Sequence, residues 1–189
     1  MGTKLLLVSS LIFLLLTPAA VLAGDPTGTQ TFTVPATAGD AAPPATWFDT
    51  GFDLLSGNPI TVTASGLAQF CPTPGPVGGS GGGCSTNPSG PIPGSPSPAL
   101  VPGGCPACPF PGAPVGTLIA KVGAGAAVVV GSGPTTLTGV GRLLFAYNDG
   151  YGAHFDNSGS YSVTITYNCQ PGNGFGDRNH YHCGPPGNP

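Results

Sequence analysis

The chain has 189 residues, a length that suits one domain or one domain with appendages. It carries only four Lys and Arg against seven acidic residues, all of them Asp. It has no basic patch, so nucleic acid is not an expected partner. Because charges are so rare, any place where Asp residues cluster is informative.

The first 23 residues have the organisation of a secretory signal peptide. Lys4 gives a positive start, residues 5–16 form an apolar run, and Val21-Leu22-Ala23 offers small residues for cleavage. The run is too short for a comfortable membrane span, and no later stretch is long enough. We therefore expect a secreted, extracellular mature protein that starts near Gly24 and has no membrane partner. An uncleaved anchor is the less favoured alternative.

Short strands separated by turn residues are expected along the rest of the chain. Residues 60–64 and 161–167 alternate apolar and polar side chains with a period of two, which is typical of a strand with one buried face. Short runs of apolar and β-branched residues predict further strands. These runs are residues 31–34, 47–52, 118–122, 126–130 and 142–147.

This pattern predicts an all-β fold, an antiparallel β-sandwich or jelly roll. No segment after the signal sustains the 3.6-residue period of a helix. The expected core consists of Trp47, Phe52, Ile60, Val62, Leu118, Ile119, Val128, Val130, Leu144, Phe145, Val163 and Ile165.

Residues 71–116 interrupt the strands with 13 Pro, 12 Gly and four of the six Cys. This composition cannot propagate a helix or a central strand, so we expect an irregular insertion held by disulfides. An even number of Cys in a secreted chain predicts three bridges. Cys105-Pro-Ala-Cys108 is interpreted as structural, because no helix start or βαβ unit accompanies it.

Residues 169–189 form a Gly/Pro-rich tail after the sandwich domain, which spans residues 24–168. Cys169 and Cys183 flank the tail segment and are expected to pair, although spacing alone leaves the pairing open. Asp177, His180 and His182 lie close together and form a possible transition-metal site. The favoured alternative is a polar tail with local hydrogen bonds.

The segment of residues 148–159 joins two predicted strands and concentrates oxygen ligands. Asp149 is followed seven residues later by Asp156 and Asn157, with Gly residues between them. Ca²⁺ takes about six to eight oxygens from carboxylates, amides and carbonyls, so this loop can wrap one ion. The spacing is not that of an EF-hand. On spacing alone, an Asx-capped hairpin loop is the favoured alternative.

Residues 47–167 resemble the galactophilic PA-IL-type bacterial lectins. The matching words are Trp47…Asp49-Thr50-Gly51, Ile60-Thr-Val-Thr-Ala-Ser-Gly66, Leu118-Ile-Ala-Lys-Val-Gly123 and Tyr147-Asn-Asp149…Asp156-Asn-Ser-Gly-Ser-Tyr-Ser-Val163. The last of these words is specific in both residue type and spacing. The resemblance implies a β-sandwich lectin with one bound Ca²⁺ per domain.

The resemblance also implies which residues act. The Ca²⁺ ligands would be side-chain oxygens of Asp149, Asp156 and Asn157 and main-chain carbonyls of Phe70 and Ala153. The ion would bridge these oxygens to two neighbouring hydroxyls of a carbohydrate. The sugar-binding residues would be Asp149, Gly150, Tyr151 and Asp156.

Two departures from the family pattern limit what carries over. Asp156 stands where the family has Asn, which adds negative charge to the ion site. The family's galactose-contacting His and Gln have no counterpart, because the Cys/Pro/Gly insertion occupies that segment. A galactose-like sugar is therefore one ligand among other glycans. For Tyr151, stacking on a sugar and simple exposure are equally favoured, whereas His154 is expected to be an exposed loop side chain.

A calcium-dependent lectin is thus the leading hypothesis. The first alternative is a structural surface protein whose loop is tied by Ca²⁺ without sugar binding. A glycosidase with Asp149 and Asp156 as acid and base is disfavoured, because a Ca²⁺-bound Asp stays ionised and cannot act as a general acid. We expect no enzymatic activity. Assembly into a homo-oligomer would raise the avidity of a weak single site.

Overall fold

The structure is a computed structural model. It describes residues 27–39, 46–55, 58–70, 84–92, 105–168, 170–171 and 181–182. The helical structure in these ranges is one turn of 3₁₀ helix, η1 (His154–Asp156). No described helix is long and apolar enough to cross a bilayer. The predicted signal of residues 1–23 lies outside the described ranges.

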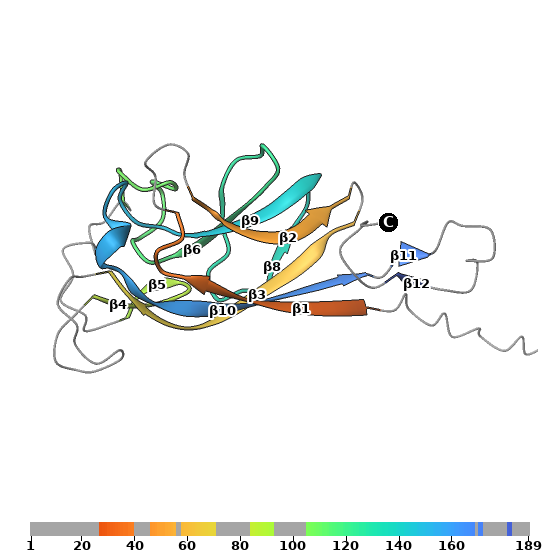
Figure 1. The fold of residues 1–189 in the computed structure, drawn as a ribbon, viewed down its shortest axis with the longest axis horizontal. Helices are drawn as coiled ribbons and strands as arrows, with labels where there is room; N and C mark the ends of the chain where they lie inside the picture. Colours follow the sequence, from red (N-terminus) through yellow and green to blue (C-terminus); the bar gives the residue numbers. More distant parts are fainter. Residues whose placement is uncertain are drawn as a thin grey trace, which may run out of the picture.

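Two antiparallel sheets pack face to face and form a sandwich (Figure 1). The first sheet has the order β1 (Thr27–Pro35), β10 (Ser158–Asn168), β3 (Ile60–Gln69), β4 (Ser85–Asn87) and β5 (Gly90–Pro91), with β8 (Thr135–Leu137) paired to β3. The second has the order β2 (Phe48–Leu54), β9 (Gly141–Tyr147), β6 (Leu118–Val122) and β7 (Val128–Val129). The predicted all-β sandwich is confirmed.

Every predicted strand region contains a strand. β6 has the predicted bounds, β1, β3 and β10 extend further, and β7 is shorter. The strands that were not predicted are short and lack an alternating pattern. They are β8, the pair β4 and β5 inside the 71–116 insertion, and a two-stranded ribbon of β11 (Gln170–Pro171) and β12 (Tyr181–His182).

The core lies between the sheets and is built from side chains at alternate strand positions. Its predicted members include Phe52, Ile60, Val62, Leu118, Val130, Phe145, Val163 and Ile165, all buried in one cluster. Phe32, Val34, Leu54, Leu143, Tyr147 and Tyr161 complete much of the rest. Ile119 is buried outside this cluster.

Three predicted core residues lie elsewhere. Leu144 is only half-buried, because its neighbour Leu143 takes the inward position in β9 and adjacent strand residues face opposite ways. Trp47 is half-buried with the Lys121 ammonium 4.5 Å from its ring centroid. Val128 is 40% exposed, because it sits on the short edge strand β7.

Three hydroxyls form a buried group that we call the tyrosine cluster: Thr86, Tyr147 and Tyr161. Thr86 Oγ1 lies 2.9 Å from Tyr147 Oη and 2.6 Å from Tyr161 Oη. Tyr161 Oη is also 2.7 Å from the carbonyl oxygen of Gly116 and 2.9 Å from that of Asn87. Burial raises the pKa of both tyrosines, so the hydroxyls stay protonated. Because Thr86 and Gly116 belong to the insertion, these bonds tie the insertion to the core.

Candidate metal centre in the loop between β9 and β10

The segment of residues 149–157, here the ligand loop, connects β9 to β10 by two successive turns. The amide of Ala153 donates to the carbonyl of Gly150 at 2.9 Å, and the amide of Asn157 donates to that of His154 at 3.2 Å. Gly152 has φ +78°, a left-handed conformation that strains other residues. The sequence therefore folds locally into a compact loop that keeps its acidic residues close to the sandwich.

Three buried side-chain oxygens of the ligand loop have no hydrogen-bond partner: Asp149 Oδ2, Asp156 Oδ1 and Asn157 Oδ1. The other oxygen of Asp149 accepts a bond from the Gly150 amide at 2.7 Å. Asn157 Nδ2 donates to the Ala36 carbonyl at 2.9 Å, which leaves Oδ1 as the remaining acceptor. Buried acceptors without donors cost free energy, so a group of three calls for a cation or another donor.

Electrostatic interactions connect these side chains to one another. Burial raises the pKa of Asp149 above its ordinary value. The Gly150 amide, the Asn157 side chain and His154 lower the same pKa, and the charge of Asp156 raises it. The predicted side-chain ligands therefore share one neighbourhood, and bringing a cation there would relieve the cost of burying the Asp149 charge.

The donor set suits a hard cation. Within the described ranges, no three His, Cys, Asp or Glu side chains gather closely enough to hold a metal ion. The ligand loop combines two carboxylates with an amide instead, which are the oxygen donors that Ca²⁺ prefers over the nitrogen and sulfur ligands of transition metals. Such a site needs main-chain oxygens to complete its coordination.

The strand register brings one predicted main-chain ligand to the ligand loop. Ser158 of β10 pairs with Gln69 of β3. Continuing this antiparallel register by one residue places Phe70 opposite Asn157. Ala153, the other predicted main-chain ligand, lies half-buried in the middle of the loop.

The predicted sugar-binding residues form the outer part of the loop. Gly150 and Asp156 are half-buried, and Tyr151 is 58% exposed. Phe155 is 80% exposed, more than any other large apolar side chain in the described ranges, and was not singled out from the sequence. A second large aromatic residue in the ligand loop, beside Tyr151, is the signal that would have identified it.

His154 is buried, so the prediction of an exposed side chain was wrong. Its Nε2 lies 3.1 Å from the carbonyl oxygen of Tyr147, at the end of β9. The ring also packs beside Gly39, where an added Cβ would lie 3.2 Å from Nε2. His154 thus joins the second turn of the ligand loop to the strand from which the loop departs. A polar ring in a polar loop gives no sequence signal of such burial.

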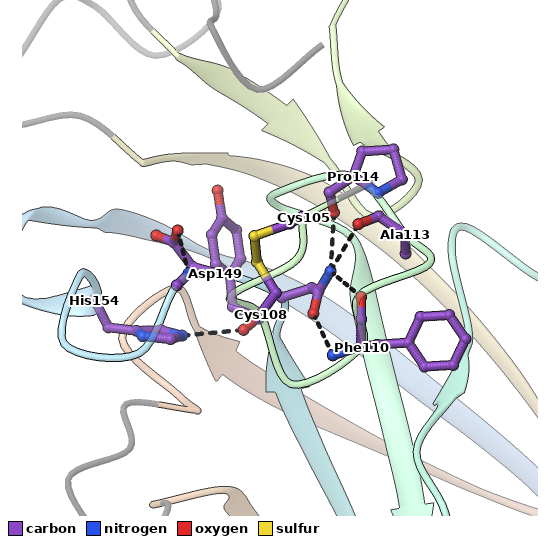
Figure 2. Close-up of a disulfide and its surroundings, with 10 residues drawn as sticks. Cys105, Cys108, Phe110, Ala113, Pro114, Asp149 and His154 are labelled. Atoms are coloured by element: carbon purple, nitrogen blue, oxygen red, sulfur yellow. Dashed lines mark hydrogen bonds between the residues drawn. A yellow bond between two sulfur atoms is a disulfide. The ribbon is translucent and has the colours of Figure 1, made fainter. Parts of the chain in front are cut away.

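The cysteines of the Cys-Pro-Ala-Cys segment form a disulfide between Cys105 and Cys108 (Figure 2). Cys84 is also disulfide-bonded, and no cysteine in the described ranges is free. The predicted pairing of Cys169 with Cys183 lies outside the described residues. Their described neighbours, Gln170 and His182, stand opposite each other in the β11–β12 ribbon.

The proposed second metal site in the tail is not tested by the structure. Asp177 and His180 lie outside the described residues. His182 lies in β12, and its side chain is not described.

Comparisons with known proteins find similarity among solved structures. No protein-family model matches the chain, and no curated protein matches it. Among solved structures, the chain is similar to one described as "EclA N-terminal domain; PllA-like lectin". The sequence identity is 24% and the TM-score 0.48, and the match covers 72% of this chain and 94% of that one. The function is therefore inferred from the ligand loop itself.

Proposed function

We propose that this chain is a secreted, calcium-dependent carbohydrate-binding protein whose ligand loop holds the ion. The observation that carries the proposal is the group of three buried oxygens without partners, on Asp149, Asp156 and Asn157. These are also the side chains that the PA-IL-type sequence pattern would use as ligands. Two independent considerations, unsatisfied burial and sequence pattern, thus select the same residues.

The residues present fit Ca²⁺ in charge and in chemistry. Two carboxylates would offset the charge of the ion, and the amide oxygen of Asn157 would add a neutral ligand. The main-chain carbonyls of Ala153 and Phe70 would add further oxygens. Ca²⁺ accepts about six to eight oxygens, so part of its coordination would remain for ligands from outside the protein. When bound, the ion would supply a hard Lewis acid for two neighbouring sugar hydroxyls.

The surrounding residues would orient the sugar. The carboxylates of Asp149 and Asp156 can accept hydrogen bonds from the same hydroxyls, and bonds to ionised acceptors are strong. Tyr151 offers an exposed ring for the apolar face of a sugar. Gly150 presents no side chain between these groups. The ligand class is thus a glycan with two adjacent hydroxyls, of which a galactose-like sugar is one example.

Calorimetry followed by a glycan array tests the proposal. The mature chain is titrated with CaCl₂ and then applied to the array with and without EDTA. We expect Ca²⁺ binding by the wild-type protein and glycan retention only in the presence of Ca²⁺. Absence of Ca²⁺ binding, or retention that EDTA leaves unchanged, would contradict the proposal. Ca²⁺ binding without glycan retention would favour a scaffold protein with a Ca²⁺-stabilised loop.

A matched pair of variants assigns the site. Asp149→Asn removes the charge of a buried ligand but keeps its shape. Asp49→Asn makes the same change on β2, where the Asp49 side chain is 61% exposed and 3.6 Å from Arg142. We expect loss of Ca²⁺ and glycan binding in Asp149→Asn and wild-type binding in Asp49→Asn. Equal behaviour of the two variants would contradict the site assignment.

A further inference from the structure

The segment of residues 105–114, here the disulfide turn, packs against the start of the ligand loop (Figure 2). The contact is made by Asn148, whose side chain is completely buried. Asn148 Nδ2 lies 3.0 Å from the carbonyl oxygen of Phe110 and 3.1 Å from those of Ala113 and Pro114. Asn148 Oδ1 accepts a bond from the Phe110 amide at 3.0 Å. One side chain thus binds both ends of the residue 110–114 stretch.

The disulfide turn is closed by covalent and hydrogen bonds of its own. The Cα atoms of Cys105 and Cys108 are 5.3 Å apart across the disulfide. The amide of Cys105 lies 3.0 Å from the Pro111 carbonyl and 3.2 Å from the Ala113 carbonyl. Cys108 is buried, with 3% of its surface exposed. These bonds hold the stretch around Asn148 independently of Asn148 itself.

The disulfide turn and its flanking segment contact the chain on both sides of Asp149. Asn148 directly precedes Asp149, and the Asn148 carbonyl accepts a bond from the Gly116 amide at 2.8 Å. On the other side, the Tyr151 amide donates to the carbonyl of Ala107 at 3.3 Å. The backbone that carries the Asp149 carboxylate is thereby fixed from two directions.

We infer that the disulfide turn is the positioning element of the proposed cation site: it holds Asp149 in its binding position through Asn148 and Tyr151. This inference rests on the proposed function. The disulfide turn contributes none of the proposed ligands, so its effect is on the geometry of Asp149. Outer-shell groups that orient metal ligands typically change metal affinity by about 10- to 100-fold, and holding a ligand in its bound conformation lowers the entropic cost of binding.

The test replaces both cysteines and compares Ca²⁺ affinity with stability. In Cys105→Ser/Cys108→Ser, opening the turn should raise the Ca²⁺ Kd about 10- to 100-fold. The control is Leu137→Ala in β8, which removes a buried core side chain. β8 pairs with Ile60–Val62, at the other end of β3 from the ligand loop. Val62 is about 23 Å along β3 from Gln69, which pairs with Ser158 beside the ligand loop, at about 3.3 Å per residue. Calorimetry is run well below every melting temperature.

A purely structural role of the disulfide turn predicts a different result. Both variants would then melt at lower temperature, and both would keep the wild-type Kd. We expect Leu137→Ala to behave in this way and the double Ser variant to lose affinity. An unchanged Kd in the double Ser variant would overturn the inference.

Amide hydrogen exchange gives a readout that does not depend on Ca²⁺. In metal-free protein, the double Ser variant should exchange the Tyr151 and Gly116 amides faster, while amides of β8 stay as protected as in the wild type. If the wild type binds no Ca²⁺, the proposed function fails, and exchange alone decides whether the turn holds the loop. Unchanged protection of the Tyr151 amide would overturn that coupling.

Should the double Ser variant fail to fold, Ala107→Gly replaces it. Ala107 is exposed, and the change removes no hydrogen bond but adds backbone freedom to the turn. We expect the Ca²⁺ Kd to rise about two- to fivefold, because the added freedom of the turn is lost when the ion binds. A wild-type Kd in this variant would also count against the positioning role.

Discussion

The tyrosine cluster and the ligand loop are both buried and both polar, but their hydrogen bonding differs. In the tyrosine cluster, each hydroxyl lies within hydrogen-bond distance of another cluster member, and Tyr161 also reaches two main-chain carbonyls. In the ligand loop, three buried oxygens have no partner. The first group can satisfy itself because hydroxyls both donate and accept. The second does not, because ionised carboxylates only accept and the Asn157 Nδ2 donates to the Ala36 carbonyl instead.

The difference separates stability from binding. A satisfied buried cluster stabilises one conformation, whereas a group of unsatisfied acceptors is stable only when something supplies positive charge or donors. Two other buried oxygens in the described ranges lack partners, Gln30 Oε1 and Thr117 Oγ1, but they lie on separate segments. Grouping, and not burial alone, therefore marks the ligand loop as a site.

The largest expected effect is a reversal of stability in Asp149→Asn. Burial raises the pKa of Asp149, so its charged form destabilises the metal-free fold at neutral pH. In EDTA, the variant should therefore melt at or above the wild-type temperature. At a Ca²⁺ concentration of 100 Kd, the wild type should gain about 2.7 kcal/mol, or about 5–11 °C. The variant should gain none, as thermal melts in both conditions would reveal.

The matched control for this reversal is again Asp49→Asn, on the exposed surface of β2. Its melting temperature should follow the wild type in EDTA and in Ca²⁺. A Ca²⁺-induced shift of equal size in Asp149→Asn and wild type would remove the distinction between the ligand loop and the tyrosine cluster.

Tyr161→Phe should have the opposite character. Losing this hydroxyl removes the Tyr161 donor from the Gly116 and Asn87 carbonyls, at a cost of about 1–3 kcal/mol of unfolding free energy, while Thr86 keeps its bond to Tyr147. The loss should be equal in EDTA and in Ca²⁺, with an unchanged Ca²⁺ Kd. Tyr167→Phe is the control on the same strand, where the ring packs 5.0 Å from that of Phe52. Denaturant unfolding measures the stability of both variants. A raised Ca²⁺ Kd in Tyr161→Phe would show that the two regions are coupled.

The tyrosine cluster should also make the fold sensitive to alkali. Burial raises the folded-state pKa of Tyr147 and Tyr161, so the folded protein keeps protons that the unfolded chain releases above about pH 10. Stability should be independent of these groups below that pH. It should fall above it by about 1.4 kcal/mol per pH unit for each tyrosine. Denaturant unfolding between pH 9 and 11 would show a shallower fall in Tyr161→Phe, and an equal slope would contradict the assignment.

How far the sequence predicts each region depends on the range of the contacts. Period-two alternation in residues 60–64 and 161–167 is local, so β3 and β10 could be predicted. β8 and β4 are three residues long, and they are strands because a neighbouring strand supplies their partners. No local pattern predicts such strands.

The same distinction holds for the candidate site. The ligand types at Asp149, Asp156 and Asn157 could be predicted because they follow one another in a short loop. The role of Asn148 could not, since its partners lie 34 to 38 residues away in an irregular insertion. The burial of His154 likewise depends on Gly39, which belongs to a distant segment.

Asp156→Asn probes the extra charge of this ligand loop. The side chain keeps an oxygen for the ion but loses its charge, and affinity for Ca²⁺ depends on the number of charged ligands. We expect the Ca²⁺ Kd to rise about tenfold, the equivalent of about 1.4 kcal/mol. Sugar binding at saturating Ca²⁺ should persist. Calorimetry measures both constants, and a Kd equal to the wild-type value would place Asp156 outside the ion's ligands.

The smallest expected effect concerns the exposed aromatic residues of the ligand loop. Tyr151→Ala should leave stability and Ca²⁺ affinity unchanged, because exposed side chains usually alter stability by less than about 0.5 kcal/mol. It should raise the sugar Kd about two- to tenfold, the size of a lost aromatic contact.

Phe155→Ala is the comparison, since Phe155 is still more exposed on the same loop. A change confined to Tyr151→Ala would place the sugar beside the first turn of the loop, whereas changes in both would extend it across η1. No change in either would remove aromatic stacking from the proposed site while leaving the cation assignment intact.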